Sequence, residues 1–226
     1  MARWQPNARE RLEHAALELF LAHGFHEITV PQITASAGLT TRTFFRHFAD
    51  KREVLFAAER ELPGLVARLL AEAPPALEPM MLIEQGLQTV ATTRFDGHRD
   101  YLRERRIVVQ ADEGLREREL RKLSVLAEAI RSGLRDRGTD EVTAAVAAQV
   151  AVTVLDVSVN RWLDQDGEEP LTEHLHDTLS ALRSLVSGSE RQAHGPEWVT
   201  QERPRSEPAA GSPGAEPGHA TPAGPR

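Results

Sequence analysis

Apolar residues recur at helical spacing along most of the chain, and no stretch alternates as a half-buried strand does. In residues 7–23 the apolar positions follow steps of three and four up to Phe20, which predicts an amphipathic helix that Gly24 ends. We therefore predict an all-α fold. The later helices that the same periodicity predicts cover residues 81–95, 101–138 with a junction at 111–114, 141–165 and 167–187.

The stretch from Thr29 to Lys51 predicts two short helices joined by a tight turn. Thr29 and Gln32 have the spacing of a capping box, which starts the first helix. Gly38 ends it, because glycine adopts a positive φ at the least cost. Thr40 then provides the N-cap of the second helix.

The second helix separates an apolar face from a polar and basic one. Phe44 and Phe48 are four residues apart and are expected to point inward, and Leu39 has the spacing for a hydrophobic staple on Phe44. A helix, a glycine turn and a short helix with basic residues outward form a helix-turn-helix. With the helix at 7–23, this predicts a three-helix N-terminal domain.

A further helix is predicted from Asp50 to residue 72, with Glu53 completing its cap. Pro63–Gly64 lies inside it, and proline removes an intrahelical hydrogen bond, so we expect a kink or a break there. We expect three regions: a DNA-binding domain at 1–52, a helical regulatory domain at 53–187, and a disordered tail rich in proline and glycine at 188–226.

Charge and composition narrow the class of protein. The net charge is −7, but residues 1–60 hold eight Lys/Arg and seven Asp/Glu, a local charge of about +1. A slightly positive N-terminal domain on an acidic body is compatible with specific DNA binding and argues against non-specific coating of nucleic acid. The absence of cysteine, of a long uncharged apolar run and of a secretory signal indicates a cytoplasmic protein without a membrane span.

Residues 9–56 resemble the tetracycline-repressor (TetR) family of bacterial regulators. The resemblance is carried by AALELFLAHGF at 15–25 and by the pattern AG-L-T-x-x-T-F-F-x-H-F-x-x-K at 37–51. It implies an N-terminal DNA-binding domain, a variable helical domain for ligand binding and dimerisation, and repression relieved by a small molecule. The positions that match the family's DNA contacts are Thr41, Arg42, Thr43, Phe45, Arg46, His47 and Lys51.

One of these positions departs from the family pattern. The family often has a tyrosine where this chain has Phe45, and a phenylalanine has no hydroxyl to bind a phosphate. Arg42 is the strongest candidate for reading a base, because its guanidinium can donate two hydrogen bonds to guanine. A phosphate contact or a solvated side chain is the alternative for Arg42, and Arg46 is as suited to phosphate as to a base.

The remaining predicted contacts differ in the roles that they allow. Thr40 and Thr43 bind phosphate or cap the helix. Lys51 precedes the next helix and suits a phosphate. His47 is a phosphate donor or a packed histidine between helices.

A single helix-turn-helix buries little DNA surface, so we expect a homodimer on a palindromic operator. Residues 141–163 are rich in alanine and valine on more than one face, and with the helix at 171–186 they are expected to form a four-helix dimer interface. The alternative is that both helices belong to the internal core.

The effector pocket is expected between the proline-rich linker at 73–79 and the dimer helices. Nearby arginines, Arg94, Arg105 and Arg106, suit an anionic or acyl ligand, although arginine runs are also common on solvated faces. The larger side chains predicted to line the pocket are Leu87, Val90, Phe95, Tyr101, Arg105, Val109 and Trp162.

Two other classes of function have less support than the regulator. An all-α enzyme is disfavoured, because no catalytic motif is present and His174 and His176, two residues apart, diverge on a helix. We expect no catalytic residue, cofactor or metal. The other alternative is a helical dimerisation protein whose DNA-reading domain is vestigial.

Overall fold

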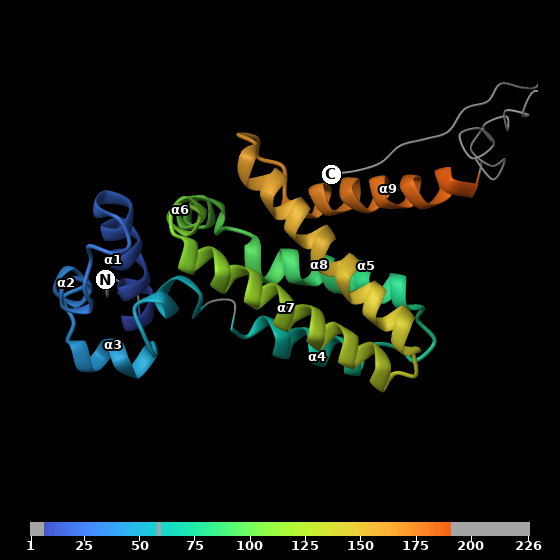
Figure 1. The fold of residues 1–226 in the computed structure, drawn as a ribbon, viewed down its shortest axis with the longest axis horizontal. Helices are drawn as coiled ribbons and strands as arrows, with labels where there is room; N and C mark the ends of the chain where they lie inside the picture. The colour runs from blue at the N-terminus through green and yellow to red at the C-terminus, as the bar shows by residue number, and fades with distance from the viewer. Residues whose placement is uncertain (1–6, 58–59, 191–226) are drawn as a thin grey trace, which may run out of the picture. The chain divides into compact units, whose positions relative to one another are not determined.

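The computed structural model describes residues 7–57 and 60–190, and every regular element in them is helical (Figure 1). The predicted all-α fold is confirmed. The elements are α1 (Ala8–His23), α2 (Val30–Ser36), α3 (Thr41–His47), the 3₁₀ helix η1 (Arg52–Leu55), α4 (Leu62–Glu72), α5 (Pro79–Val90), the π-helical turn η3 (Ala91–Phe95), α6 (Arg99–Gln110), α7 (Glu113–Asp136), α8 (Glu141–Asp164) and α9 (Leu171–Glu190).

The two short helices α2 and α3 begin and end where the sequence predicts. The backbone N–H of Thr29 donates to the side-chain oxygen of Gln32 at 2.8 Å as part of the capping box. Gly38 turns the chain at a φ of +62°, and the hydroxyl of Thr40 accepts from the backbone N–H of Thr43 at 3.2 Å. Local sequence therefore determines this turn, since each bond joins residues three apart.

The N-terminal core is built from α1, α2 and α3 around Phe44 and Phe48, both fully buried. It also contains residues distant in the sequence: Val108 and Val109 from α6 and Leu115 from α7. The three-helix domain thus rests on the later helices by an apolar contact. Val109, predicted as a pocket residue, lies chiefly in this core.

The segment after Asp50 differs from the predicted long helix. Asp50 does accept from the backbone N–H of Glu53 at 2.8 Å, but the helix that follows is the single 3₁₀ turn η1. Helix α4 begins anew at Leu62, and Pro63 lies in its first turn. A first-turn N–H has no intrahelical acceptor, so proline is tolerated there and starts a helix instead of kinking one.

Helix α7 lies at the centre of the remaining helices and packs against both α4 and α8 (Figure 1). The close approach of α4 depends on Gly133, because a Cβ atom there would lie 2.5 Å from Cδ1 of Leu70 and 3.2 Å from its Cβ. A Cβ atom at Gly133 therefore fits only if the Leu70 side chain shifts from its packed position.

We predict that Gly133→Ala destabilises the protein by about 1–2 kcal/mol, because overpacking outweighs the better helix propensity of alanine. Gly86→Ala is the matched control, since Gly86 also lies inside a helix but a Cβ atom there would have no neighbour within 4 Å. We expect that control to gain about 0.5–1 kcal/mol. Denaturant unfolding measures both changes, and an equal gain for the two variants would contradict the role of Gly133.

Helix α8 is, among the described helices, the one whose length and hydropathy are sufficient to cross a membrane. Its buried residues show instead that it is a core helix. Ala144, Ala148, Ala151 and Leu155 recur at steps of three and four and pack in the same core as α7. The small alanines let the two helices approach closely.

The described residues up to Ser184 form one compact unit, and the described residues from Leu185 to Glu190 fall in a second. The predicted tail starts at residue 188, but α9 continues to Glu190. The rest of the predicted tail lies outside the described residues.

Candidate nucleic-acid interface and effector cavity

Helix α3 separates its residues as predicted into a buried and an exposed face. Phe44 is fully buried, whereas Phe45 is 56% exposed despite being its neighbour. Arg42 and Arg46, four residues apart, are exposed together with Thr41. The outward face therefore offers two guanidinium groups together with an exposed aromatic ring.

The threonines at the start of α3 cap the helix. Besides accepting from the backbone N–H of Thr43, the Thr40 hydroxyl lies 3.0 Å from the Thr43 hydroxyl. The predicted roles of these threonines are helix capping and phosphate binding, and capping is present in the free protein. Each hydroxyl can still form a hydrogen bond with a second partner, because an oxygen lone pair or the proton remains available. His47 is half-buried, and its Nε2 lies 3.4 Å from Arg46 Nη2.

Lys51 has a structural task that differs from the predicted phosphate contact. Its Nζ donates to the carbonyl oxygens of Phe25 at 2.7 Å and Ile28 at 2.8 Å, with His26 at 3.5 Å, and lies 4.2 Å from the centre of the Phe25 ring. Burial, followed by the charge of Arg52, lowers the pKa of Lys51. An ammonium group has three hydrogens, so these carbonyls satisfy it without DNA.

Arg11 supports the turn from the other side. Its Nη2 donates to the carbonyl of Ala37 at the end of α2, which is one of the carbonyls that a helix end leaves without an intrahelical partner. A Cβ at Gly38 would lie 3.0 Å from the same nitrogen. The turn between α2 and α3 is thus held by a side chain from α1.

We predict that Lys51→Met lowers stability by about 1–3 kcal/mol through loss of these charge-assisted bonds. Because Lys51 is engaged inside the protein, the slope of log affinity for DNA against log salt concentration should not change. Thermal unfolding and a salt titration of DNA binding measure the two effects. A slope reduced by about one with unchanged stability would instead support a direct phosphate contact.

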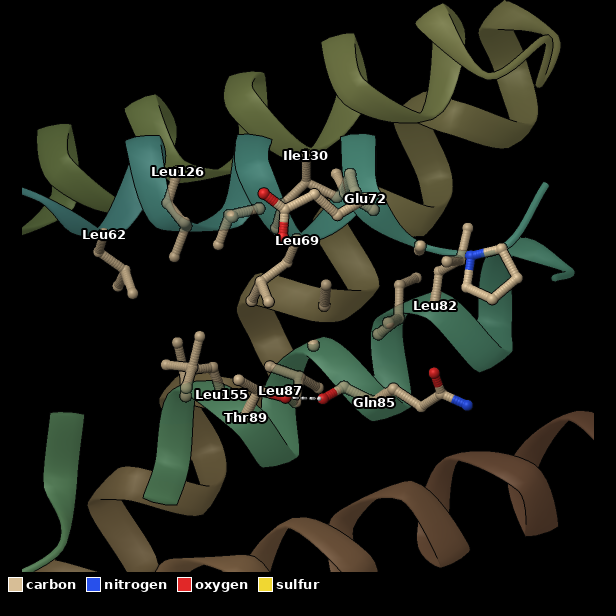
Figure 2. Close-up of a pocket in the computed structure, with 18 residues that line it drawn as sticks. Leu62, Leu69, Glu72, Leu82, Gln85, Leu87, Thr89, Leu126, Ile130 and Leu155 are labelled. Atoms are coloured by element: carbon tan, nitrogen blue, oxygen red, sulfur yellow. Dashed lines mark hydrogen bonds between the residues drawn. The ribbon is translucent and has the colours of Figure 1, made fainter. Parts of the chain in front are cut away.

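A cavity of about 270 Å³ lies between α4, α5, α7 and α8 (Figure 2). Its wall is aliphatic: Leu69 and Leu70 come from α4, Leu82 and Leu87 from α5, and Ile130 from α7. The exposed residues along its edge are Glu72, Pro74 and Gln85, two of which are polar. An apolar cavity with a few polar groups at its opening is the usual form of a small-molecule site.

The predicted pocket residues do not come together in this cavity. Leu87 and Val90 line it, but the other five predicted residues do not. Tyr101 instead packs edge-on against His14 of α1 with ring centres 5.8 Å apart, and burial raises its pKa to about 12. Trp162 packs against Phe95 and donates its indole N–H to the carbonyl of Glu169 at 3.1 Å.

The arginines of α6 hold the end of α8 and leave no positive charge in the described lining of the cavity. Arg99 donates to the carbonyls of Trp162 and Gln165, and Arg103 donates to Leu163 at 2.9 Å. Arg106 adds an ion pair with Asp164 at 2.5 Å. These carbonyls are the unpaired acceptors at a helix C-terminus, where cations are favourable. Arg105 and Arg106 line a separate cavity together with Phe95 and Val109, so the predicted use of these arginines for an anionic ligand stays a prediction. Arg94 pairs with Glu61 at 3.1 Å.

Phe56 is the centre of a charged cluster that sequence patterns do not reveal. Its buried ring lies 4.8 Å from the guanidinium carbon of Arg105 and 4.6 Å from Lys122 Nζ, with Arg118 at 5.6 Å. Burial lowers the pKa of Lys122 to about 7. Residue 56 is far in the sequence from residues 105, 118 and 122, so helical periodicity, which relates residues within a few turns, could not predict the cluster.

The same cluster joins η1 to α6 and α7 by hydrogen bonds. Arg105 is buried and donates to the carbonyl of Leu55 at 2.6 Å and to Glu119 at 2.6 Å. Glu53, also buried, pairs with Arg118 and with Arg60. A second link lies on the other side, where His26 Nε2 is 2.6 Å from the buried carboxylate of Asp112 at the start of α7. Hydrogen bonds and ion pairs thus connect the η1 segment after α3, and His26 before α2, to α6 and α7.

Comparison with known proteins gives its strongest sequence match in the N-terminal domain. Residues 13–58 match the family described as bacterial regulatory proteins, tetR family. Over 89 residues the chain is 35% identical to the HTH-type transcriptional regulator TcmR of Streptomyces glaucescens. The aligned residues make up 39% of this chain and 39% of TcmR. The matches to curated relatives span 22 to 42% of those proteins' length.

Solved structures resemble the chain over a greater length. A transcriptional regulator from Pseudomonas aeruginosa PAO1 superimposes with a TM-score of 0.54 at 18% identity, covering 84% of this chain and 96% of the other. A TetR-family regulator from Syntrophomonas wolfei superimposes with a TM-score of 0.53 at 16% identity, covering 79% and 94%. At these identities the likeness concerns the fold alone.

Proposed function

We propose that the protein is a cytoplasmic repressor of the TetR family that binds a palindromic operator as a homodimer, because residues 13–58 match this family of bacterial regulatory proteins. A small molecule would release it from the operator. In this proposal the protein is a DNA-binding regulator and not an enzyme, which the match of residues 13–58 to the tetR family supports. We assign DNA binding to residues 1–52, regulation to 53–187, and leave 188–226 as a tail.

Recognition of DNA is assigned to the exposed face of α3, and this is the observation that carries the proposal. Arg42 and Arg46 project from one short helix whose opposite face is anchored by the buried Phe44. A helix so anchored places its side chains in the major groove at fixed positions. The proposed contacts are Thr40, Thr41, Arg42, Thr43, Phe45, Arg46 and His47, with Lys51 holding the domain together.

Dimerisation is assigned to α8 with α9. Although α8 packs in the core on one side, Val142 and Val146 remain 72% and 59% exposed. Val146, Val150 and Leu182 border a shallow apolar groove on this face. An exposed apolar helix face is costly in water, and a two-fold related copy would cover it.

Release of DNA is assigned to movement of α4. One side of α4 lines the cavity, and its first residue lies a few positions after the segment that holds Phe56 and Glu53. A ligand that separates α4 from α5 would shift this segment and with it the position of α3. In a dimer, such a shift changes the distance between the two recognition helices, which must match one turn of DNA.

The test of this function is selection of bound sequences from a genomic DNA library, followed by footprinting at low salt. We expect a palindromic site whose half-sites are about 10 bp apart, centre to centre, and a protein that elutes as a dimer. Absence of any footprint would overturn the assignment. Equal recovery of all sequences would favour a helical dimerisation protein with a vestigial DNA-reading domain.

A further inference from the structure

The cavity between α4, α5, α7 and α8 also indicates what kind of molecule it binds. We propose that the effector is an uncharged, mainly aliphatic molecule of about ten non-hydrogen atoms with one hydrogen-bonding group at the cavity opening. This inference rests on the proposed function in that it concerns the ligand of the same regulator. It differs from the anionic ligand that the nearby arginines could suit, and agrees with their alternative interpretation as solvated side chains.

The charges that line the cavity disfavour an anion, and the arginine at its edge, Arg137, donates to the backbone carbonyls of Leu70 and Ala73. Among the described residues that line it, Glu72 is the only ionisable one, and no Lys, Arg or His is present. A buried carboxylate needs a cation or several donors to offset its lost hydration, and the described lining offers no cation. The arginines nearby in the sequence are engaged at the end of α8 and around Phe56.

A cation is not favoured either. The described lining contains no aromatic ring that would attract a cation through its face. Glu72 is exposed, so its carboxylate acts through water, where an ion pair contributes little. The aliphatic wall formed by residues such as Leu70, Leu82 and Ile130 therefore leaves apolar burial as the main source of affinity.

Two hydrogen-bonding residues of α5, Gln85 and Thr89, are among those that line the cavity (Figure 2). The Thr89 hydroxyl donates to the Gln85 carbonyl at 2.9 Å, so its oxygen remains able to accept a bond from a ligand. The side-chain amide of Gln85 is exposed and provides both a donor and an acceptor. These two groups suit a single hydroxyl or carbonyl on an otherwise apolar ligand.

The volume sets the size of the ligand. A water-sized group occupies about 30 Å³, so a cavity of about 270 Å³ holds roughly nine to ten such groups. This is slightly below the usual range for ligand sites, which begins at about 300 Å³. A saturated chain or compact terpene-like skeleton of ten carbons matches this volume.

The test compares three molecules with the same ten-carbon chain, 1-decanol, decanoate and decylamine, titrated by calorimetry into the full-length protein. We expect 1-decanol to bind, decanoate to bind at least tenfold more weakly, and decylamine to bind no more tightly than 1-decanol. Shortening the alcohol should weaken binding by about fourfold for each methylene. Equal or tighter binding of decanoate or tighter binding of decylamine would overturn the proposal, as would no binding of 1-decanol.

Two variants locate the binding. Glu72→Gln is an exposed change that should strengthen decanoate binding and leave 1-decanol unaffected. Gly86→Leu should abolish 1-decanol binding while the melting temperature is kept, because Gly86 lines the cavity and a Cβ there has no neighbour within 4 Å. Unchanged 1-decanol binding by Gly86→Leu would place the ligand elsewhere and overturn the proposal.

Operator binding is measured separately, so that the two proposals fail in different ways. If 1-decanol binds as expected but does not release operator DNA, the ligand class stands and the repressor mechanism fails. If the protein is released from its operator by another molecule while 1-decanol does not bind, the mechanism stands and the ligand class fails.

Discussion

Replacing Arg42 with alanine is expected to weaken operator binding by roughly 2–6 kcal/mol for the dimer, since each half-site loses a base contact of about 1–3 kcal/mol. Arg42 is exposed on α3, so its loss should leave stability unchanged. The preference of the protein for one base over the other three should also become weaker at one position in each half-site. Competition binding against operators changed at single positions measures both effects.

Two controls separate base reading from general charge. Arg42→Lys keeps the positive charge but removes the paired donors of the guanidinium, so it should restore the salt dependence but not the base preference. Arg121→Ala removes an exposed arginine of α7 whose ion pair is with the exposed Glu117, and should change nothing. If Arg42→Ala bound every operator as the wild type does, α3 would not be the reading helix as proposed.

Replacing Phe56 with alanine is expected to cost about 3–5 kcal/mol of unfolding free energy, because a fully buried aromatic ring leaves a cavity that its neighbours cannot fill. The cost is increased by the guanidinium groups of Arg105 and Arg118 near the ring, which would lose a favourable partner inside the protein. Denaturant unfolding of the purified variant gives this difference directly.

The sequence offers a matched control for Phe56 in Phe45. Phe45→Ala removes the same atoms from a largely exposed position, so we expect a change of no more than about 0.5 kcal/mol. Phe56→Leu keeps most of the apolar volume but removes the ring, and should fall between the two. Equal losses for Phe45→Ala and Phe56→Ala would contradict the packing described for Phe56.

Phe56 also links stability to regulation in the proposed mechanism. The ring lies between η1, directly behind α3, and the side chains of α6 and α7. Phe56→Leu should therefore lower the ratio of operator affinities without and with ligand by a larger factor than it lowers the operator affinity of the ligand-free protein. The ratio of operator affinities with and without ligand is the measurement that tests this link.

Local sequence was sufficient for the N-terminal domain because its signals are short-range. Thr29 with Gln32 and Thr40 with Thr43 join residues three apart, and Gly38 is required by a single backbone angle. The inward position of Phe44 and the outward position of Phe45 follow from helical periodicity alone. Helix boundaries at Gly97 and Gly138 were predictable for the same reason, since each adopts a positive φ.

Proline shows where such local signals become ambiguous. The sequence predicts a break inside a helix at Pro63, but this proline starts a helix. A proline forbids the helix before it and favours the helix after it, and the sequence does not say which side is helical. The packing of α4 against α7, with Gly133 beneath Leu70, selects the later start.

The sequence by itself determined the helical fold, the turn between α2 and α3 and the exposed basic face of α3, because all three depend on neighbours within one or two helical turns. The partners of the charged side chains were decided by the tertiary structure. Lys51 reaches carbonyls more than 20 residues away, and Arg105 reaches Leu55 across 50 residues. The effector cavity was likewise decided by packing, since its wall combines four helices whose contacts no periodicity encodes.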